Sequence, residues 1–259
     1  MFSTADAYER YMGRWSHSLA PALVAFAELD DGQAVLDVGS GTGVLSFAVR
    51  DATTTSRITG IDLSADYVAY ASRHADPRVR FQVGDAQQLP FAAASFDATL
   101  SLLAINFVPD PTRAVIEMTR VTKPGGIIAA AVWDYGDGMQ MLRVFWDEAV
   151  AFDPAIEPRD ERHLPLCRAG ELGALWNQTG LANVHEAPLT VARHFATFDD
   201  YWAPFLLGQG PAGSCVASLP KDRQAELERR LRKRLLGDGP DRPIDLQARV
   251  WAVKGTTPR

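Results

Sequence analysis

The chain has 259 residues, of which 47% are hydrophobic and 22% charged, and its formal net charge is -6. This length and composition fit one enlarged α/β domain, or one domain with a small addition, and they exclude a disordered chain. The acidic balance argues against nucleic acid as the main partner and favours a small molecule.

Signals for targeting, disulfides and metals are missing from the sequence. The N-terminus lacks the basic and apolar segments of a secretion signal, and no run of about eighteen apolar residues occurs. We therefore expect a cytoplasmic protein with no membrane span. The two cysteines, Cys167 and Cys215, and the five histidines have no zinc-ligand spacing, so we predict neither a disulfide framework nor a bound metal.

The N-terminal segment has helical periodicity. Residues 4 to 13 place apolar and aromatic side chains at helical spacing, and we expect Gly13 to interrupt this helix before a second one that runs to Leu29. Trp15 follows the break, where it can act as a surface clamp or simply pack against other aromatic rings. We interpret residues 1–33 as an N-terminal helical lid.

The next stretch combines a strand with a glycine-rich turn. Residues 34–38 predict a buried parallel strand that contains Asp37, and Gly39–Gly43 predicts the tight turn into a helix over Val44–Arg50. Glycine permits left-handed backbone angles and the close approach of a ligand. A dinucleotide site would carry a third glycine at Val44, so the Gly-x-Gly-x-Gly spacing here is of another type.

Two carboxylates follow the next two strands. Asp62 lies at the carboxyl end of the predicted strand Arg57–Leu63. It is about 20 residues beyond the glycine turn, where doubly wound folds place an acid that accepts ribose hydroxyls. Since Ser64 already suits the N-cap of the helix that follows, we favour ligand binding for Asp62. Asp85 and Ala86 follow the strand over 79–84 in the same manner.

Strands and helices continue to alternate up to Trp133. A central strand is predicted over 95–104, a helix over Pro111–Val121 with Asp110 as its N-cap, and a fifth strand over 127–133. This alternation predicts a doubly wound α/β fold with helices on both faces of a parallel sheet.

The motifs resemble those of class I S-adenosylmethionine-dependent methyltransferases, in particular the small-molecule, ubiquinone/menaquinone-biosynthesis-like group. Asp37 stands two positions before the first glycine of Gly39-Ser40-Gly41-Thr42-Gly43, and the stretch from Gly84 to Phe91 reads Gly-Asp-Ala-x-x-Leu-Pro-Phe. The resemblance implies a Rossmann-like, seven-stranded, mostly parallel sheet with an antiparallel terminal strand and a helical lid. It also implies S-adenosylmethionine as cofactor and S-adenosylhomocysteine as product.

The resemblance assigns cofactor contacts residue by residue. Arg14 would pair with the methionyl carboxylate, Asp62 would accept the ribose hydroxyls, and Asp85 would accept the adenine amino group. Many relatives carry a histidine pair where this chain has Asn106-Phe107, so no histidine base is predicted there. The full predicted cofactor set is Arg14, Gly39, Ser40, Gly41, Asp62, Leu63, Asp85, Ala86, Leu102, Leu103 and Phe107.

From Asp134 onward the sequence no longer follows the strand–helix alternation of residues 34–133. We predict that 34–133 is the cofactor-binding core and that 134–259 completes the sheet and adds helical substrate-cap segments. Aromatic residues at helical spacing over 139–152 and 198–206 suit either a substrate lid or ordinary core packing. A Gly/Pro loop is expected over 208–213, and the basic run 229–234 is interpreted as a solvated helix face.

These features predict a methyltransferase that acts on a small-molecule acceptor by direct displacement. An NAD-dependent oxidoreductase and a non-catalytic module that binds S-adenosylmethionine remain as alternatives. No catalytic residue is assigned, and His163 in the variable segment is left open as a base. The acceptor and the oligomeric state are not predicted.

Overall fold

The structure is a computed structural model that describes residues 5–259; the first four residues of the predicted lid lie outside this range. The chain groups into two compact units. The first unit comprises Met1–Trp15, Asp134–Leu164 and Thr190–Arg249, and the second comprises Ser16–Trp133, Pro165–Leu189 and Val250–Arg259. The predicted division at residues 33 and 133 into a lid, a core and a completing segment stays a prediction.

One seven-stranded sheet has the order β3-β2-β1-β4-β5-β7-β6. The strands pair in parallel from β3 to β5, whereas β7 is antiparallel to β5. The predicted mostly parallel, seven-stranded sheet with an antiparallel terminal strand is thus confirmed. The strands are β1 (Ala34–Val38), β2 (Arg57–Asp62), β3 (Val79–Val83), β4 (Phe96–Leu102), β5 (Thr122–Trp133), β6 (Ala182–Phe195) and β7 (Ile244–Thr256).

The strand order reverses beside β1, which positions the candidate site. β1 pairs with β2 on one side and with β4 on the other, so that Asp37 is in register with both Gly60 and Leu100. Because the three strands are parallel, their carboxyl ends meet at one edge of the sheet. Such a reversal is where open α/β sheets bind ligands.

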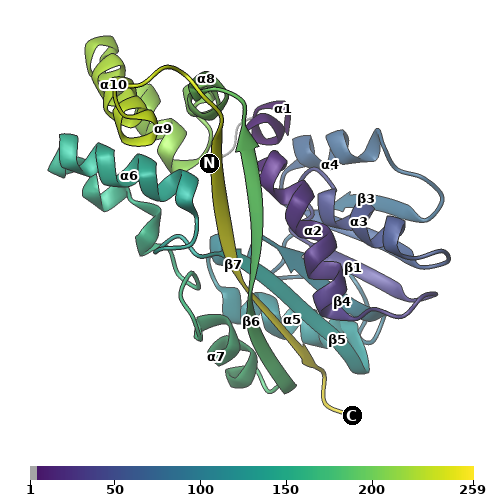
Figure 1. The fold of residues 1–259 in the computed structure, drawn as a ribbon. Helices are drawn as coiled ribbons and strands as arrows, with labels where there is room; N and C mark the ends of the chain where they lie inside the picture. The colour runs from purple at the N-terminus through teal and green to yellow at the C-terminus, as the bar shows by residue number, and fades with distance from the viewer. Residues whose placement is uncertain (1–4) are drawn as a thin grey trace. The chain divides into compact units, whose positions relative to one another are not determined.

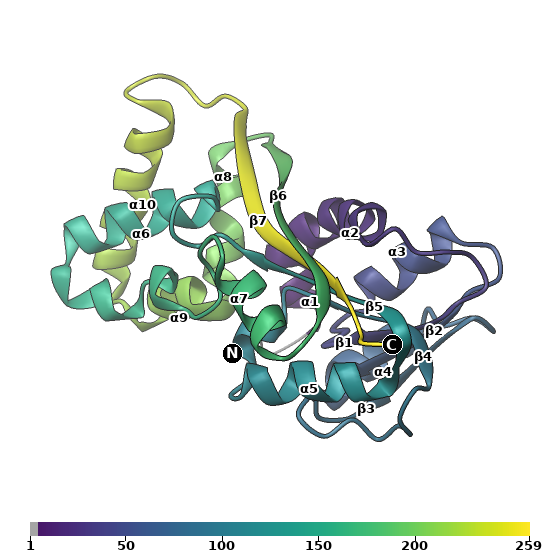
Figure 2. The same cartoon turned by 90° about the horizontal axis from the view of Figure 1, so that it is seen from below.

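Helices of the second unit cover both faces of its strands. Figure 2 shows α5 on the opposite side of the strands from α2 and α3. The predicted caps are present, since Ser64 Oγ accepts from the amide of Tyr67 and the Asp110 carboxylate accepts from the amide of Arg113. The helices are α2 (Arg14–Ala27), α3 (Val44–Ala52), α4 (Ala65–Ser72), η2 (Ile105–Phe107), α5 (Pro111–Val121) and α7 (Glu171–Gln178).

The first unit is built mainly from helices. Figure 1 shows α6 and α10 side by side, in teal and yellow-green. Its core is aromatic, with Phe145, Tyr201 and Phe205 all fully buried. The elements are α1 (Ala5–Tyr8), η1 (Glu9–Gly13), α6 (Gln140–Phe152), η3 (Pro154–Arg159), η4 (Glu161–His163), α8 (Phe198–Trp202), η5 (Ala203–Leu207), α9 (Gly210–Ser218) and α10 (Lys221–Leu236).

Two sequence-based expectations are wrong. The predicted Gly/Pro loop over 208–213 is largely helical, because α9 begins at Gly210 and Pro211 occupies its first turn, where a missing N–H costs no hydrogen bond. Gly13 does not interrupt the N-terminal helix, since the chain passes through the π-helical turn η1 directly into α2. Within residues 5–259, no helix has both the length and the apolarity needed to cross a bilayer.

Candidate functional site

The glycine turn after β1 has backbone angles that require glycine. Gly39, Gly41 and Gly43 have φ angles of +73°, +51° and +90°, all in the left-handed region that favours this residue. A Cβ atom on Gly39 would lie 2.3 Å from the Cβ of Ala104, the residue that precedes η2. The turn therefore packs directly against the chain that leaves β4, as close backbone approach demands.

Gly41 differs from Gly39 and Gly43 because the space next to its Cα is open. A Cβ atom added there would meet no atom within 4 Å. Its amide donates a 2.8 Å hydrogen bond to Oδ2 of Asp62 at the end of β2. The backbone here is accessible to a bulky ligand, and a side chain would fill the space that such a ligand needs.

Asp62 supports the turn and keeps capacity for a ligand. Its Oδ1 accepts from the Ser64 amide at 2.8 Å while Oδ2 accepts from Gly41. Burial raises the pKa of Asp62, and these two hydrogen bonds partly oppose that shift. Since an ionised carboxylate offers about four acceptor sites, ribose hydroxyls can still donate to it.

Asp85 lies at the turn after β3 and already accepts from a nitrogen donor. Its Oδ1 accepts from the Gln87 amide at 2.8 Å, and the Gln87 side-chain Nε2 lies 3.2 and 3.3 Å from its two oxygens. An adenine amino group is the same type of donor. Such a ligand would take the place of the Gln87 side chain. Ala86, which lies between Asp85 and Gln87 in the chain, is half-buried.

Apolar side chains are exposed at the same strand ends. Leu63 is 74% exposed directly after β2, and Val83 is 51% exposed at the end of β3. Val83 is in register with Asp62, so the two apolar groups lie on neighbouring strand ends. The flat face of an aromatic ring such as adenine would cover such surface. Leu63 belongs to the predicted cofactor set, whereas Val83 does not; its place at a predicted strand end is the sequence signal that would point to it.

The end of β4 provides the remaining predicted residues. Leu102 is 9% exposed and Leu103 has a left-handed φ of 58°, which is a strained angle for a side chain of this size. The Leu103 amide donates to the Ala131 carbonyl at 2.8 Å, and the Phe107 amide donates to that of Ala104 at 2.9 Å. Leu103, Ala104 and η2 thus form the wall that the glycine turn contacts through Gly39.

Several buried polar atoms of the second unit make no hydrogen bond with any residue in the described range. Asn106 is the clearest case, because it is 4% exposed and both its Oδ1 and Nδ2 lack a partner. Its sequence signals are its place shortly after a predicted strand end and its position where many relatives carry a histidine. Unsatisfied buried groups usually have a water or ligand partner. The other such atoms near the turn are Asp37 Oδ1, Ser40 Oγ, Thr42 Oγ1 and Ser101 Oγ.

Asp37, which precedes the turn, is itself an unusual carboxyl. It is 1% exposed and its Oδ2 accepts from Ser46 Oγ at 2.7 Å. Burial raises its pKa to about 7, and the bonds from Ser46 only partly oppose this. Taken together, the open Gly41, the two strand-end carboxylates and these unsatisfied atoms fit a polar ligand with an aromatic ring, as S-adenosylmethionine is.

Arg14 belongs to the first unit and already has a carboxylate partner. Its guanidinium contacts the two oxygens of Asp200 at 2.7 and 3.1 Å and lies over the Phe195 ring. A cofactor carboxylate would have to share or displace Asp200, so the predicted contact of Arg14 with the cofactor stays a prediction. His163 is exposed and lies 2.7 Å from Glu157. Among residues 5–259, no group of three or more metal-ligating side chains could hold an ion.

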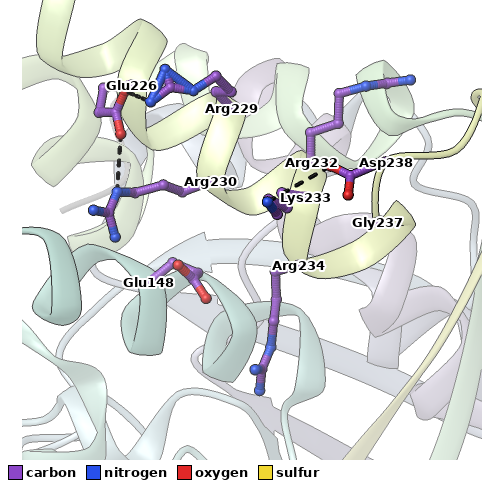
Figure 3. A pocket seen from close by; sticks show the side chains of 9 residues that line it. All are labelled: Glu148, Glu226, Arg229, Arg230, Arg232, Lys233, Arg234, Gly237 and Asp238. Carbon is purple, nitrogen blue, oxygen red and sulfur yellow. Dashed lines mark hydrogen bonds and ion pairs between the residues drawn. The ribbon is translucent and has the colours of Figure 1, made fainter.

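The basic run lies on α10 beside a hollow of about 680 Å³, and its six consecutive residues go round more than one turn of the helix. In Figure 3 the cations point in different directions, and Glu226 and Asp238 pair with Arg230 and Lys233. The cations therefore do not converge on one point, as an anion site requires. The lining residues are Glu148, Glu226, Arg229, Arg230, Arg232, Lys233, Arg234, Gly237 and Asp238.

Comparisons with known proteins agree with the cofactor motifs. Residues 36–130 match the family model described as a methyltransferase domain. Malonyl-[acyl-carrier protein] O-methyltransferase of Pectobacterium atrosepticum is 33% identical over 166 residues, which are 60% of this chain and 64% of that protein. Demethylmenaquinone methyltransferase of Renibacterium salmoninarum is 34% identical over 146 residues, 56% of this chain and 59% of that protein.

In both pairs the match spans less than two thirds of the relative's own length. Among solved structures, the YcgJ protein of Bacillus subtilis has a TM-score of 0.62 and 21% identity, with 94% of this chain and 99% of that chain covered. At this level of identity the likeness concerns the fold alone.

Proposed function

We propose, from the match of residues 36–130 to the methyltransferase domain model, that this chain is an enzyme that methylates a small-molecule acceptor. The domain is of the class I, S-adenosylmethionine-dependent type, with the sheet order and glycine turn described above. Of the relatives' names, demethylmenaquinone denotes a small molecule and malonyl-[acyl-carrier protein] a small malonyl group carried by a protein; both support a small methyl-accepting group. The net charge of -6 supports a partner other than nucleic acid; the cytoplasmic location stays a prediction.

The observation that carries this proposal is the open backbone at Gly41 beside the Asp62 carboxylate. We propose that Gly39, Ser40 and Gly41 hold the amino-acid end of S-adenosylmethionine and that Asp62 holds its ribose. Asp85, Ala86 and Leu63 would then hold the adenine, and Leu102, Leu103 and Phe107 would border the sulfonium. An NAD site is less well supported, because Val44 replaces the third glycine of its motif.

When bound, S-adenosylmethionine supplies an electrophilic methyl carbon whose bond to sulfur breaks as the bond to the acceptor atom forms. The protein's part is to hold the reacting groups in line, an effect worth up to roughly 7–11 kcal/mol in favourable systems. The segment from Leu103 to η2 suits this task. The hydrogen bond from the Leu103 amide to the Ala131 carbonyl and the packing of Ala104 against Gly39 hold its backbone in place. We assign no general base.

Calorimetric titration with S-adenosylhomocysteine tests the cofactor assignment. Asp62→Asn should weaken binding by about tenfold to a hundredfold, since hydrogen bonds to a charged group contribute roughly 1.5–3 kcal/mol. Asp66→Asn removes the same charge four positions later, on an exposed residue of α4, and should bind like the wild type.

Turnover then separates an enzyme from a binding module. Incubation with S-adenosylmethionine and a metabolite library should release S-adenosylhomocysteine in the presence of at least one acceptor. Binding of NADH without binding of S-adenosylhomocysteine would instead support an oxidoreductase, and equal affinities for wild type and Asp62→Asn would remove Asp62 from the site.

A further inference from the structure

The side chain of Gln87 joins two segments of the second unit that border the candidate cofactor site. Gln87 follows β3 and is half-buried. Its Nε2 lies 3.2 and 3.3 Å from the two carboxylate oxygens of Asp85, and its Oε1 accepts a 3.1 Å hydrogen bond from the amide of Asp110. Asp110 is the N-cap of α5 and lies shortly after η2. One side-chain amide thus links the end of β3 to the chain that leaves η2.

The main chain of Gln87 is held independently of this link. Its amide donates to Asp85 Oδ1 at 2.8 Å, and its carbonyl accepts from Nε of Arg113 at 3.2 Å. The amide of Gln88 also donates to the carbonyl of Asp85, at 3.1 Å. None of these three bonds uses the Gln87 side chain, so that side chain can rotate away while the loop after β3 keeps its conformation.

Asp85 differs from Asp62 in the kind of donor that it accepts from. The two oxygens of Asp62 accept from the backbone amides of Gly41 and Ser64, each at 2.8 Å. Asp85 accepts from one backbone amide and from Nε2 of Gln87, whose distances lie at or just beyond the usual limit for an N–H···O hydrogen bond. The Gln87 side chain is therefore a donor that a ligand can replace, whereas the amides on Asp62 are fixed by the backbone.

Adenine carries the same pair of groups as a glutamine side chain. In both, an NH2 donor is bonded to an sp² carbon that also bears an acceptor, which is the carbonyl oxygen in glutamine and ring atom N1 in adenine. Nε2 of Gln87 lies almost equally far from both oxygens of Asp85. It thus occupies the position in front of the carboxylate that the amino group of adenine would need.

We propose that the Gln87 side chain is an internal competitor of the adenine amino group: it occupies Asp85 in the free protein and is displaced when the methyl donor binds. This inference rests on the function proposed above, in which Asp85 holds the adenine. Displacement breaks the contacts of Nε2 with Asp85, so the site binds the cofactor more weakly than it would without Gln87.

The same displacement acts on the start of α5. When the Gln87 side chain leaves, the amide of Asp110 loses Oε1 as its acceptor. Because Asp110 is exposed, water can take the place of Oε1. Cofactor binding at the end of β3 thereby releases the link to the chain that leaves η2.

Calorimetric titration of the full chain with S-adenosylhomocysteine tests the competition. Gln87→Ala should bind about threefold or more tighter than the wild type, because the free variant has no such side-chain hydrogen bonds to lose. Gln88→Ala shortens the neighbouring, exposed glutamine and should bind like the wild type.

A second ligand identifies the group that displaces Gln87. This ligand is the analogue of S-adenosylhomocysteine in which a hydrogen atom replaces the amino group of adenine. It has no NH2 donor to take the place of Nε2 on Asp85. Gln87→Ala and the wild type should therefore bind it with affinities that agree within about twofold.

The amide resonance of Asp110 in proton–nitrogen correlation spectra measures the link to α5. S-adenosylhomocysteine should move this resonance of the wild type towards its position in free Gln87→Ala, since the amide has lost Oε1 of Gln87 in both proteins. The same ligand should move the resonance much less in Gln87→Ala. Free Gln88→Ala should resemble the free wild type.

Several outcomes would overturn the inference while the wild type binds S-adenosylhomocysteine. These are equal or weaker binding by Gln87→Ala, equal tightening by Gln88→Ala, equal tightening for the analogue without the amino group, or an Asp110 resonance that does not respond to the ligand. Each of them would leave the proposed function in place. Absence of S-adenosylhomocysteine binding by both the wild type and Gln87→Ala would instead contradict the proposed function itself.

Discussion

The glycine turn of the second unit and the aromatic core of the first unit bring their groups together in two different ways. At the turn, the polar groups are backbone amides and carboxylates at consecutive strand ends, and the sheet register brings them together. In the aromatic core, rings from different helical segments meet through side-chain packing, as Tyr11 does with Phe205. The first arrangement can be recognised in short sequence motifs, whereas the second cannot.

The largest expected effect disrupts a buried ion pair of the first unit. Arg143→Met removes one of the two arginine partners of Asp160, whose side chain is 1% exposed. Because Arg162 remains, the free energy of unfolding should fall by about 2–3 kcal/mol, less than for a buried charge left without any partner. Arg234→Met makes the same change on an exposed residue of α10 and should change it by less than about 0.5 kcal/mol. Urea denaturation measures both, and a loss below about 1 kcal/mol in Arg143→Met would show that the ion pair contributes little.

A smaller effect distinguishes two consequences of a side chain in the glycine turn, namely lower stability and weaker ligand binding. Gly41→Ala and Gly180→Ala both force a side chain into a left-handed angle with no atom within 4 Å, so each should lose about 1–2 kcal/mol of stability. Only Gly41→Ala should also weaken S-adenosylhomocysteine binding, by about tenfold or more. If both variants bind like the wild type, the open space at Gly41 is not ligand space.

The smallest effect concerns pH and the Asp37 carboxyl. Its folded pKa of about 7 lies above the ordinary value of 3.8, so between these pH values the folded protein binds more protons than the unfolded chain. Stability from this group therefore falls as pH rises, by about 1 kcal/mol between pH 6 and pH 7. Asp37→Asn should remove that part of the slope, whereas the contribution of Glu161, whose pKa is also raised, should remain. Urea denaturation at both pH values measures the difference, and an unchanged slope would contradict the assignment.

The features predicted best from the sequence are those that depend on residues close together in the chain. The bounds of α5 follow from the Asp110 cap and Pro111, and Asp62 and Asp85 follow from their positions at strand ends. Sequence reasoning failed at Gly210 because a glycine and a proline start a helix as readily as they form a loop. The burial of Glu161 could not be predicted, since Glu161 follows a proline-rich stretch without periodicity and its hydrogen-bond donor Trp146 lies 15 residues away in the chain.

The number of residues in the π-helical turn η1 sets the orientation of Tyr11 relative to α2. An α-helix advances by about 100° per residue, so deleting one residue from η1 would restore the α-helical pattern and rotate Tyr11 by about that angle relative to Trp15 at the start of α2. The glycine turn and its strands would keep their sequence. A single-codon deletion in this turn would therefore reorient Tyr11 without any substitution in the residues proposed to hold the methyl donor.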